Sequence, residues 1–255
     1  MDPMASFPLI CTAGLAVGVL YGLFGVGSAF ATPILAVIGV PGMAAVAGPL
    51  PALLPGSMTG AWSYSREGKV DWWVAKRTIA GAFPAAIVGA ISSQWVSGPL
   101  LVAISGGVLL LIGLRVLRPV DTDAERTPWA RTHPILLVAA AIVVGFSSGL
   151  LANGGGFLLV PLFLLAVGLD MNQATGTSLV VASLLTIPTL VAHAFIGDID
   201  WAVSLIFAVG LIPGARVGAL AAGRLATDKL RSAFGVLLVG FAIWFLVREV
   251  PQLIG

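Results

Sequence analysis

Residues 22–35, GLFGVGSAFATPIL, interrupt a long apolar stretch with glycines and return to apolar sequence at Pro33. Residues 149–163, GLLANGGGFLLVPLF, repeat this arrangement in the second half of the chain and return at Pro161. A glycine-rich break exposes backbone N–H and C=O groups that need partners. Two breaks of the same kind therefore need a structural or a functional explanation.

The composition predicts an all-α polytopic membrane protein. Hydrophobic residues make up 58% of the 255 residues and charged residues 9%, whereas a soluble domain averages about 25% charged residues. Residues 3–65, 78–114, 132–169 and 171–197 contain no Asp, Glu, Lys or Arg, and a spanning helix needs about 20 apolar residues. The strict alternation of a membrane β-barrel is missing, which leaves the helical bundle. The N-terminal residues carry no basic segment, so we expect the first helix to be retained rather than cleaved.

The same composition argues against several other classes of protein. Cys11 is the single cysteine, which excludes an internal disulfide and a multi-cysteine metal site. Two histidines and carboxylates confined to predicted loops and termini offer no nucleophile–base pair and no metal cluster. No basic cluster is interleaved with aromatic residues, as a nucleic-acid surface requires. We therefore expect a protein that is not an enzyme, with no cofactor, no metal and no nucleic-acid partner.

The chain contains an internal repeat. Shifted by 129 positions, the first half aligns glycines, aspartates and prolines with the second: Gly68, Asp71 and Trp72 with Gly197, Asp200 and Trp201, and Gly81, Pro84 and Gly89 with Gly210, Pro213 and Gly218. The sequence predicts a first membrane repeat in residues 1–117, a polar cytoplasmic linker at 118–134 and a second repeat in 135–255. Internal repeats of this length are typical of secondary transporters.

Each repeat is predicted to contain a broken helical element and three transmembrane helices. The broken elements cover 8–24 with 29–38 and 135–151 with 157–168. The spans follow at 43–65, 72–96 and 100–117, and at 174–196, 202–222 and 230–247. The ten residues 29–38 reach only about 15 Å as a helix, so they either complete one long broken helix or turn back as a re-entrant arm.

The basic residues favour the re-entrant alternative. If each broken element crosses once, the halves run parallel, and nine basic residues face three, Arg224, Lys229 and Arg231, across the membrane. If each broken element turns back, the halves are inverted, and eleven basic residues share one side with only Arg248 opposite. The positive-inside rule favours the second count. We therefore predict inverted repeats with both termini outside, although nine to three is also a permitted bias.

The breaks could form an anion site. A helix that begins inside the membrane presents free N–H groups and a partial positive charge. Ser28 and Asn153 occupy expected N-cap positions, and Gly27, Gly154, Gly155 and Gly156 lack the Cβ that would hold a ligand away. Polar residues of the following spans, including Thr175, Thr177 and Ser178, could line the cavity, although Ser and Thr commonly bond back to their own helix. Close packing of helices is the alternative explanation for the glycines.

Two ionisable residues fall within predicted spans. Arg216 could be the counter-charge for a bound anion, or its head could reach the interface from the helix end. His193 could handle a proton, although a histidine satisfied at a helix end is the commoner case.

The motifs resemble those of the TauE/SafE family of sulfite and organosulfonate exporters. GFSSGLLANGGGFLLVPLFLLAVGLDMNQATGTSL resembles the second-half signature, GLFGVGSAFATPILAVIGVPG resembles a first-half variant, and GDIDW and PGARVGA also fit. The resemblance implies a multi-pass carrier of the prokaryotic inner membrane for small sulfur-containing anions, with Gly25–Ala29 and Asn153–Gly156 as the translocation core. The first copy, GVGSA, departs from the three-glycine form.

These observations predict an alternating-access exporter of sulfite or an organosulfonate that binds its anion near the bilayer midplane. The alternatives are a passive anion channel with the same site, a membrane enzyme and a scaffold subunit. The sequence leaves open the particular anion, the direction of transport, a coupling ion such as the proton, and the oligomeric state.

Overall fold

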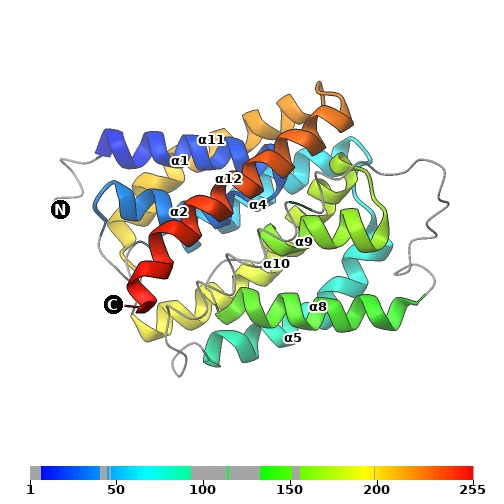
Figure 1. Ribbon diagram of the computed structural model, residues 1–255, viewed down its shortest axis with the longest axis horizontal. Helices are drawn as coiled ribbons and strands as arrows, with labels where there is room; N and C mark the ends of the chain where they lie inside the picture. The colour runs from blue at the N-terminus through cyan, green and yellow to red at the C-terminus, as the bar shows by residue number, and fades with distance from the viewer. Residues whose placement is uncertain are drawn as a thin grey trace.

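The computed structural model describes residues 7–40, 45, 47–92, 114, 133–150, 156–197 and 199–254, and every regular element in them is helical. Figure 1 shows these helices as one bundle, in which α1 begins and α12 ends on the same side of the view. The first repeat contributes α1 (Phe7–Phe24), α2 (Gly27–Val37), α4 (Leu50–Arg66) and α5 (Trp72–Ser92). The second contributes α8 (Pro134–Leu150), α9 (Gly156–Leu162), the π-helical turn η2 (Phe163–Val167), α10 (Met171–Ile196), α11 (Trp201–Ala222) and α12 (Thr227–Ile254).

Four helices of the described residues are long and apolar enough to cross a membrane: Phe7–Phe24, Trp72–Ser92, Met171–Phe195 and Trp201–Ala222. The helical class predicted from composition is therefore confirmed. The predicted short segments correspond to α2 and to α9 with η2, and the span predicted at 43–65 corresponds to the 17-residue α4. The span predicted at 100–117 and the linker at 118–134 lie outside the described residues, apart from Leu114, His133 and Pro134.

Three aspartates fix where helices begin. The Asp170 carboxylate accepts a hydrogen bond from the Gln173 amide at 2.9 Å, and the Asp200 carboxylate accepts from the Ala202 and Val203 amides at 3.0 and 3.1 Å. The Asp71 carboxylate accepts from the Val74 amide at 3.0 Å. Each carboxylate thereby satisfies amides that have no acceptor within the helix. The aspartates of the repeated Gly-x-x-Asp-Trp frame are helix caps.

Helices α1 and α11 pack in the same direction through glycines on both partners. The glycines of α1 abut the α11 backbone in rising order: Gly14 against Phe207, Gly18 against Leu211 and Gly22 against Ala215. The glycines of α11 abut the α1 backbone likewise: Gly210 against Cys11, Gly214 against Leu15 and Gly218 against Val19. Small residues allow two membrane helices to approach this closely. These six glycines inside α1 and α11 therefore serve close packing of the two helices.

Helices α5 and α8 form a second pair of the same kind. Their glycines also meet partner backbone in rising order: Gly145 against Ala82, Gly149 against Ala86, Gly81 against Val138 and Gly89 against Phe146. In the repeat alignment α8 corresponds to α1, and α5 corresponds to α11. The first helix of each predicted repeat thus packs against a helix of the other repeat.

The chain turns back between α1 and α4. The Tyr64 hydroxyl, near the end of α4, donates to the Gly22 carbonyl near the end of α1 at 2.9 Å. The Ser204 hydroxyl, near the start of α11, donates to the Gly48 carbonyl just before α4 at 2.7 Å. Because α1 and α11 run together, α4 begins beside the start of α1 and ends beside its end. The segment that contains α2 therefore returns to the side from which α1 came, as the re-entrant alternative requires.

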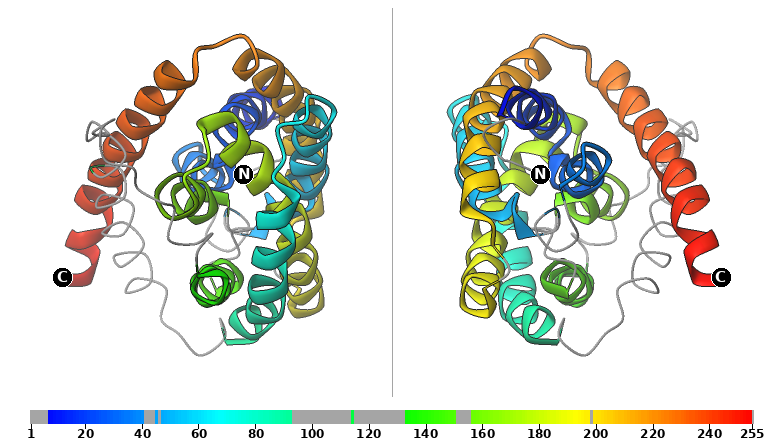
Figure 2. Two further views of the ribbon diagram at one scale, coloured as in Figure 1. Left: turned by 90° about the vertical axis from the view of Figure 1, so that its right-hand side faces the viewer. Right: turned by 90° about the vertical axis from the view of Figure 1, so that its left-hand side faces the viewer.

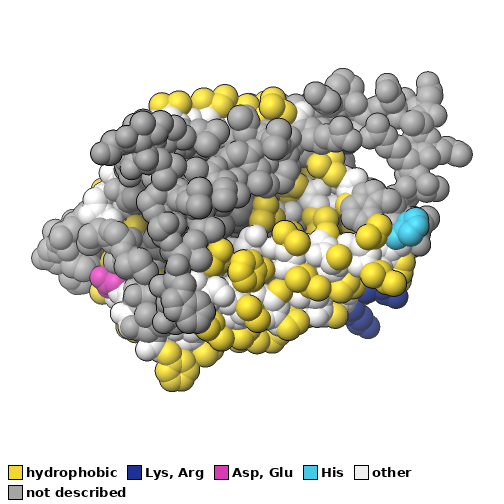
Figure 3. Space-filling model, turned by 60° about the horizontal axis from the view of Figure 1, so that its bottom comes forward, with side chains coloured by type: hydrophobic (Ala, Val, Ile, Leu, Met, Phe, Trp, Pro, Cys, Tyr) yellow, Lys and Arg dark blue, Asp and Glu magenta, His cyan; other side chains and the backbone are white. Residues whose placement is uncertain are grey.

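The ends of α4 and α11 meet at one end of the bundle. A methyl group added to Gly223 would lie 3.2 Å from the Glu67 carboxylate. The turns that carry Arg66 and Arg224 are therefore neighbours. Apolar side chains cover much of the described surface seen in Figure 3, and the Lys and Arg side chains visible there gather at one end. This distribution is that of a membrane protein with one strongly basic end.

Candidate functional site

The first break lies at Gly25 and reverses the chain. Gly25 has a φ of 72°, a backbone conformation that glycine adopts without strain, and its amide donates to the Tyr21 carbonyl at 2.8 Å. Helix α2 then packs back against α1, since a methyl group on Gly27 would lie 2.7 Å from the Val17 carbonyl. In Figure 2, α2 and α9 lie between the α1–α11 pair and the α5–α8 pair.

The structure corrects one detail of the predicted helix start. Helix α2 begins at Gly27, so Ser28 is its second residue and does not occupy the predicted N-cap position. The Ala29 amide donates to the Val26 carbonyl at 3.0 Å and is already satisfied. The amides of Gly27 and Ser28 are then those for which helix geometry provides no intrahelical acceptor. Gly27 packs against Tyr21 so closely that any side chain at this position would collide with it. The absence of a side chain therefore allows α2 to begin at residue 27, before the predicted start.

Gly25 faces the second half of the chain. A methyl group on Gly25 would collide with the Ser178 hydroxyl of α10 and would lie 3.1 Å from Val160 of α9 and 3.5 Å from the Thr175 methyl group. Residues about 150 positions apart in the sequence thus meet at the first break. The predicted site residues Gly25 and Ser178 are brought together, with Gly27 two residues away.

Thr175 supplies a polar group without a partner beside this break. Its side chain is fully buried, and its hydroxyl has no hydrogen-bond partner among the described residues. The neighbouring Ser178 hydroxyl donates to the Thr175 carbonyl at 2.9 Å, which is bonding back to its own helix. A buried hydroxyl without a partner is unfavourable, and none of the described residues satisfies the Thr175 hydroxyl.

Thr177 has a different position from the one predicted. Its hydroxyl accepts a hydrogen bond from the Asp71 amide at 3.0 Å, so it anchors the turn between α4 and α5. Gly176 packs in the same region, against the Lys69 carbonyl and the Tyr64 side chain. Thr177 is therefore occupied in a contact between the two halves.

The second break falls largely outside the described residues. Asn153, Gly154 and Gly155 lie there, and Gly156 is the first residue of α9. Their predicted part in the site stays a prediction. What is described is the helix that follows, whose Val160 contacts the first break.

Neither ionisable candidate lies at the first break. Arg216 is exposed and lines a separate pocket with Arg66 and Glu67. His193 is buried in the last turn of α10, where its carbonyl accepts from the Gly197 amide at 3.1 Å. Eighteen residues separate His193 from Thr175, about 27 Å along a helix. Groups of three or more potential metal ligands do not occur among the described residues.

The sequence analysis did not identify the two tyrosines as part of this region. Tyr21 contacts Gly27 and Tyr64 bonds to the Gly22 carbonyl, and both side chains are buried. These are the only two tyrosines of the chain. Both tyrosines lie near the ends of predicted segments, where tyrosine is usual in membrane proteins, so their sequence positions gave no signal of this contact.

A bundle of apolar helices, four of them long enough to cross a membrane, has the architecture of a polytopic membrane protein. The family model for the sulfite exporter TauE/SafE matches residues 10–245. The chain belongs to this family, and the resemblance found in the motifs is confirmed.

The curated relatives are also membrane transporters by name. A "Probable membrane transporter protein" of Xylella fastidiosa strain 9a5c is 30% identical over 264 residues, which cover 96% of this chain and 98% of the relative. "Probable membrane transporter protein YjnA" of Bacillus subtilis is 26% identical, over 82% of this chain and 87% of the relative. No solved structure matches the chain.

Proposed function

We propose that this membrane transporter is a secondary carrier that exports a small sulfur-containing anion, such as sulfite or an organosulfonate, across the prokaryotic inner membrane. The anion binds at the start of α2, where the Gly27 and Ser28 amides have no acceptor within the helix and where Gly25 meets Thr175 and Ser178 of α10. The family membership supports the substrate class. The main support for the proposal is the contact of Gly25 with Ser178 and Val160. This contact places the break of the first repeat against α10 and α9 of the second repeat.

The chemistry at the break suits an anion. The first amides of an 11-residue helix and its dipole favour negative charge without a charged side chain. The Thr175 hydroxyl adds a donor in a buried environment. Asp170 and Asp200 are the described carboxylates nearest in sequence to Thr175 and Ser178, and both accept hydrogen bonds from helix N-termini.

We further propose that the two repeats are inverted and alternate around this site. Two observations support inversion. Helix α4 runs with α1, and α5 returns from the end of α4, so α8, which runs with α5, opposes α1, its equivalent in the repeat. The direct contact of Gly60 with Leu179 and of Tyr64 with Gly176 indicates that α4 and its equivalent α10 run in opposite directions. Such equivalent but opposed elements are what alternating access between inverted repeats uses.

The basic end of the bundle supports the orientation. Glu67 meets Gly223, so the turn with Arg66 and the turn with Arg224 share one end. That arrangement corresponds to the eleven-to-one count of basic residues. By the positive-inside rule this end and the 118–134 linker are cytoplasmic.

Transport by purified protein in lipid vesicles tests the site. Gly25→Ala introduces a methyl group against Ser178 and also forces alanine into positive φ. Gly68→Ala is a matched control, since Gly68 has a φ of 68° and open space around its Cα. We expect Gly25→Ala to reduce sulfite flux at least about tenfold, while Gly68→Ala, with the same backbone strain of roughly 1–2 kcal/mol, keeps it. Equal flux in the two variants would place the anion elsewhere.

A passive anion channel is the second candidate, since it would use the same break. Reversal potentials in vesicles separate the two: channel flux follows only the electrochemical gradient of the anion, whereas a carrier with a coupling ion follows both gradients. A binding screen with sulfite, sulfate, thiosulfate, sulfoacetate, taurine and carboxylate controls then identifies the solute. Preference for carboxylates over every sulfur anion would contradict the proposed substrate class.

A further inference from the structure

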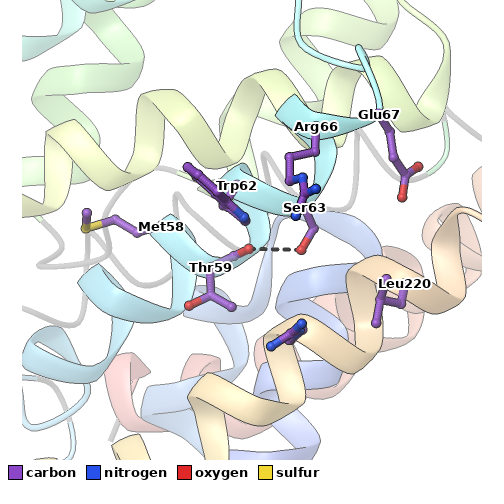
Figure 4. Close-up of a pocket in the computed structure, with 8 residues that line it drawn as sticks. Met58, Thr59, Trp62, Ser63, Arg66, Glu67 and Leu220 are labelled. Atoms are coloured by element: carbon purple, nitrogen blue, oxygen red, sulfur yellow. Dashed lines mark hydrogen bonds between the residues drawn. The ribbon is translucent and has the colours of Figure 1, made fainter.

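A second polar site lies on the outside of the bundle, away from the break. A pocket of about 530 Å³ lies between the last turns of α4 and the last turns of α11. Figure 4 shows Arg66 and Ser63 on one helix facing a space that Leu220 of the other helix borders. Arg216 also lines this pocket. The pocket is therefore built by both halves of the chain.

The pocket carries two positive charges, Arg66 and Arg216, without a carboxylate partner among the residues that the structure describes. Neither Arg66 nor Arg216 forms an ion pair with a carboxylate of the described residues; Glu67, the acidic residue of the lining, pairs instead with Lys69 at 2.6 Å. Two guanidinium groups beside one engaged carboxylate leave the pocket positive. Each guanidinium presents five N–H donors in a planar fork that fits phosphate oxygens.

The hydroxyl groups of the pocket donate inside the protein. The Thr59 hydroxyl donates to the Pro55 carbonyl at 2.8 Å, and the Ser63 hydroxyl donates to the Thr59 carbonyl at 3.1 Å, the latter drawn in Figure 4. Both hydroxyl hydrogens are thus already donated to carbonyl groups of α4. The two arginines and the Trp62 indole N–H are the lining donors that remain for a ligand, and the two positive charges among them favour an anion with several oxygens.

The rest of the pocket is apolar and opens outward. The exposed fractions are 56% for Met58, 68% for Trp62 and 48% for Leu220. Large apolar side chains exposed on a membrane-spanning bundle face lipid tails. Trp62 lies one helical turn before Arg66, so on α4 the apolar side chains of the pocket lie deeper in the membrane than the Arg66 charge. The ligand must therefore combine an anionic head with an apolar tail.

We propose that this pocket binds the phosphate of an anionic phospholipid, with Arg66 and Arg216 on the phosphate oxygens and an acyl chain along Met58, Trp62 and Leu220. The site belongs to the end of the bundle where basic residues gather, and anionic lipids attract such residues. The bound lipid fills the space between α4 and α11. It joins helices from the two halves at their ends.

Binding of short-chain phosphatidylglycerol to the purified chain in detergent tests the proposal. We expect Arg66→Gln and Arg216→Gln each to weaken binding about tenfold, the effect of losing a charge-assisted hydrogen bond. Arg224→Gln is the matched control, because it removes one exposed positive charge from the same end without lining the pocket. The control should change affinity less than about twofold. Equal affinities of Arg216→Gln and Arg224→Gln would overturn the proposal even if Arg66→Gln fails to fold.

The choice of ligand is tested separately. Glycerol phosphate, which has the head without the tail, should bind at least about tenfold more weakly than phosphatidylglycerol, because burial of apolar tail adds affinity. Equal binding would mean a site for free phosphate esters. Phosphatidylcholine of the same chain length should also bind more weakly, and equal binding would mean a nonspecific lipid contact.

Fluorescence locates the acyl chain. Phosphatidylglycerol brominated on its tail should quench tryptophan fluorescence in vesicles more than brominated phosphatidylcholine does. The difference should disappear in Trp62→Phe, which keeps an aromatic ring in the pocket. Persistence of the full difference in Trp62→Phe would place the anionic lipid at another tryptophan and contradict the assignment.

Discussion

Replacing Gly22 with alanine should separate helices α1 and α11. An added Cβ at Gly22 would collide with the Ala215 carbonyl oxygen and would lie 2.6 Å from the Ala219 nitrogen and 2.9 Å from the Ala215 carbonyl carbon. All three are backbone atoms of α11, so no side-chain rotation can relieve the contact. The two helices must therefore move apart. This movement also loosens the other close contacts between the glycines of one helix and the backbone of the other.

Two opposed effects determine how much Gly22→Ala changes the free energy of unfolding. Forcing a methyl group into a packed interface destabilises by about 1–3 kcal/mol, whereas Gly→Ala within a helix stabilises by about 1 kcal/mol. Gly240→Ala is the control, because Gly240 lies in α12 with no atom within 4 Å of the added Cβ. Both variants gain the same stabilisation from replacing a glycine with alanine inside a helix. The difference between them is then the packing loss of about 1–3 kcal/mol.

The single cysteine provides the assay. Cys11 is half-buried in α1, where its carbonyl abuts Gly210 of α11. A thiol-reactive dye therefore reports separation of the two helices on heating in detergent. We expect Gly22→Ala to melt about 2–12 °C below Gly240→Ala, by the scaling for chains of this size. Equal melting temperatures would refute the view that backbone contact at Gly22 holds the two helices together.

Three further predictions concern the break and the topology. Thr175→Val should lower sulfite affinity about fivefold to tenfold without loss of stability, because the hydroxyl has no protein partner among the described residues; unchanged affinity in a binding titration would remove Thr175 from the site. Tyr64→Phe should lower the free energy of unfolding by about 1 kcal/mol through loss of the bond to the Gly22 carbonyl, whereas Ser63→Ala, which loses only a bond within α4, should change it less in the same thermal assay. In a Cys11→Ser background, Ser65→Cys and Ala194→Cys, which are exposed and equivalent in the repeat, should react with an impermeant maleimide from opposite sides of the membrane; labelling from one side would reject inversion.

The local features of this chain could be predicted from the sequence because they depend on neighbouring residues. Charge-free runs require helices in lipid, and the glycines at 25 and 27 mark the position where α1 ends and α2 begins. The spans predicted at 72–96 and 202–222 begin directly after Asp71 and two residues after Asp200, and both aspartates cap helices. The family was recognisable from the same short motifs, since each is continuous in the chain.

What the sequence did not supply are contacts between residues far apart in the chain. Thr177 was grouped with Ser178 as cavity lining, but its hydroxyl holds the Asp71 amide, 106 residues away. Arg216 has no polar neighbour in sequence, yet it shares a pocket with Arg66.

The sequence by itself determined that the chain is a helical membrane protein with two glycine-rich breaks. Hydrophobicity and backbone hydrogen bonding act locally, so composition and short motifs suffice for them. Only the tertiary structure decided that α2 turns back along α1, that α1 pairs with α11, and that Gly25 meets Ser178. These outcomes depend on which small residues let which backbones approach, and glycines of identical local sequence character can serve either packing or a site.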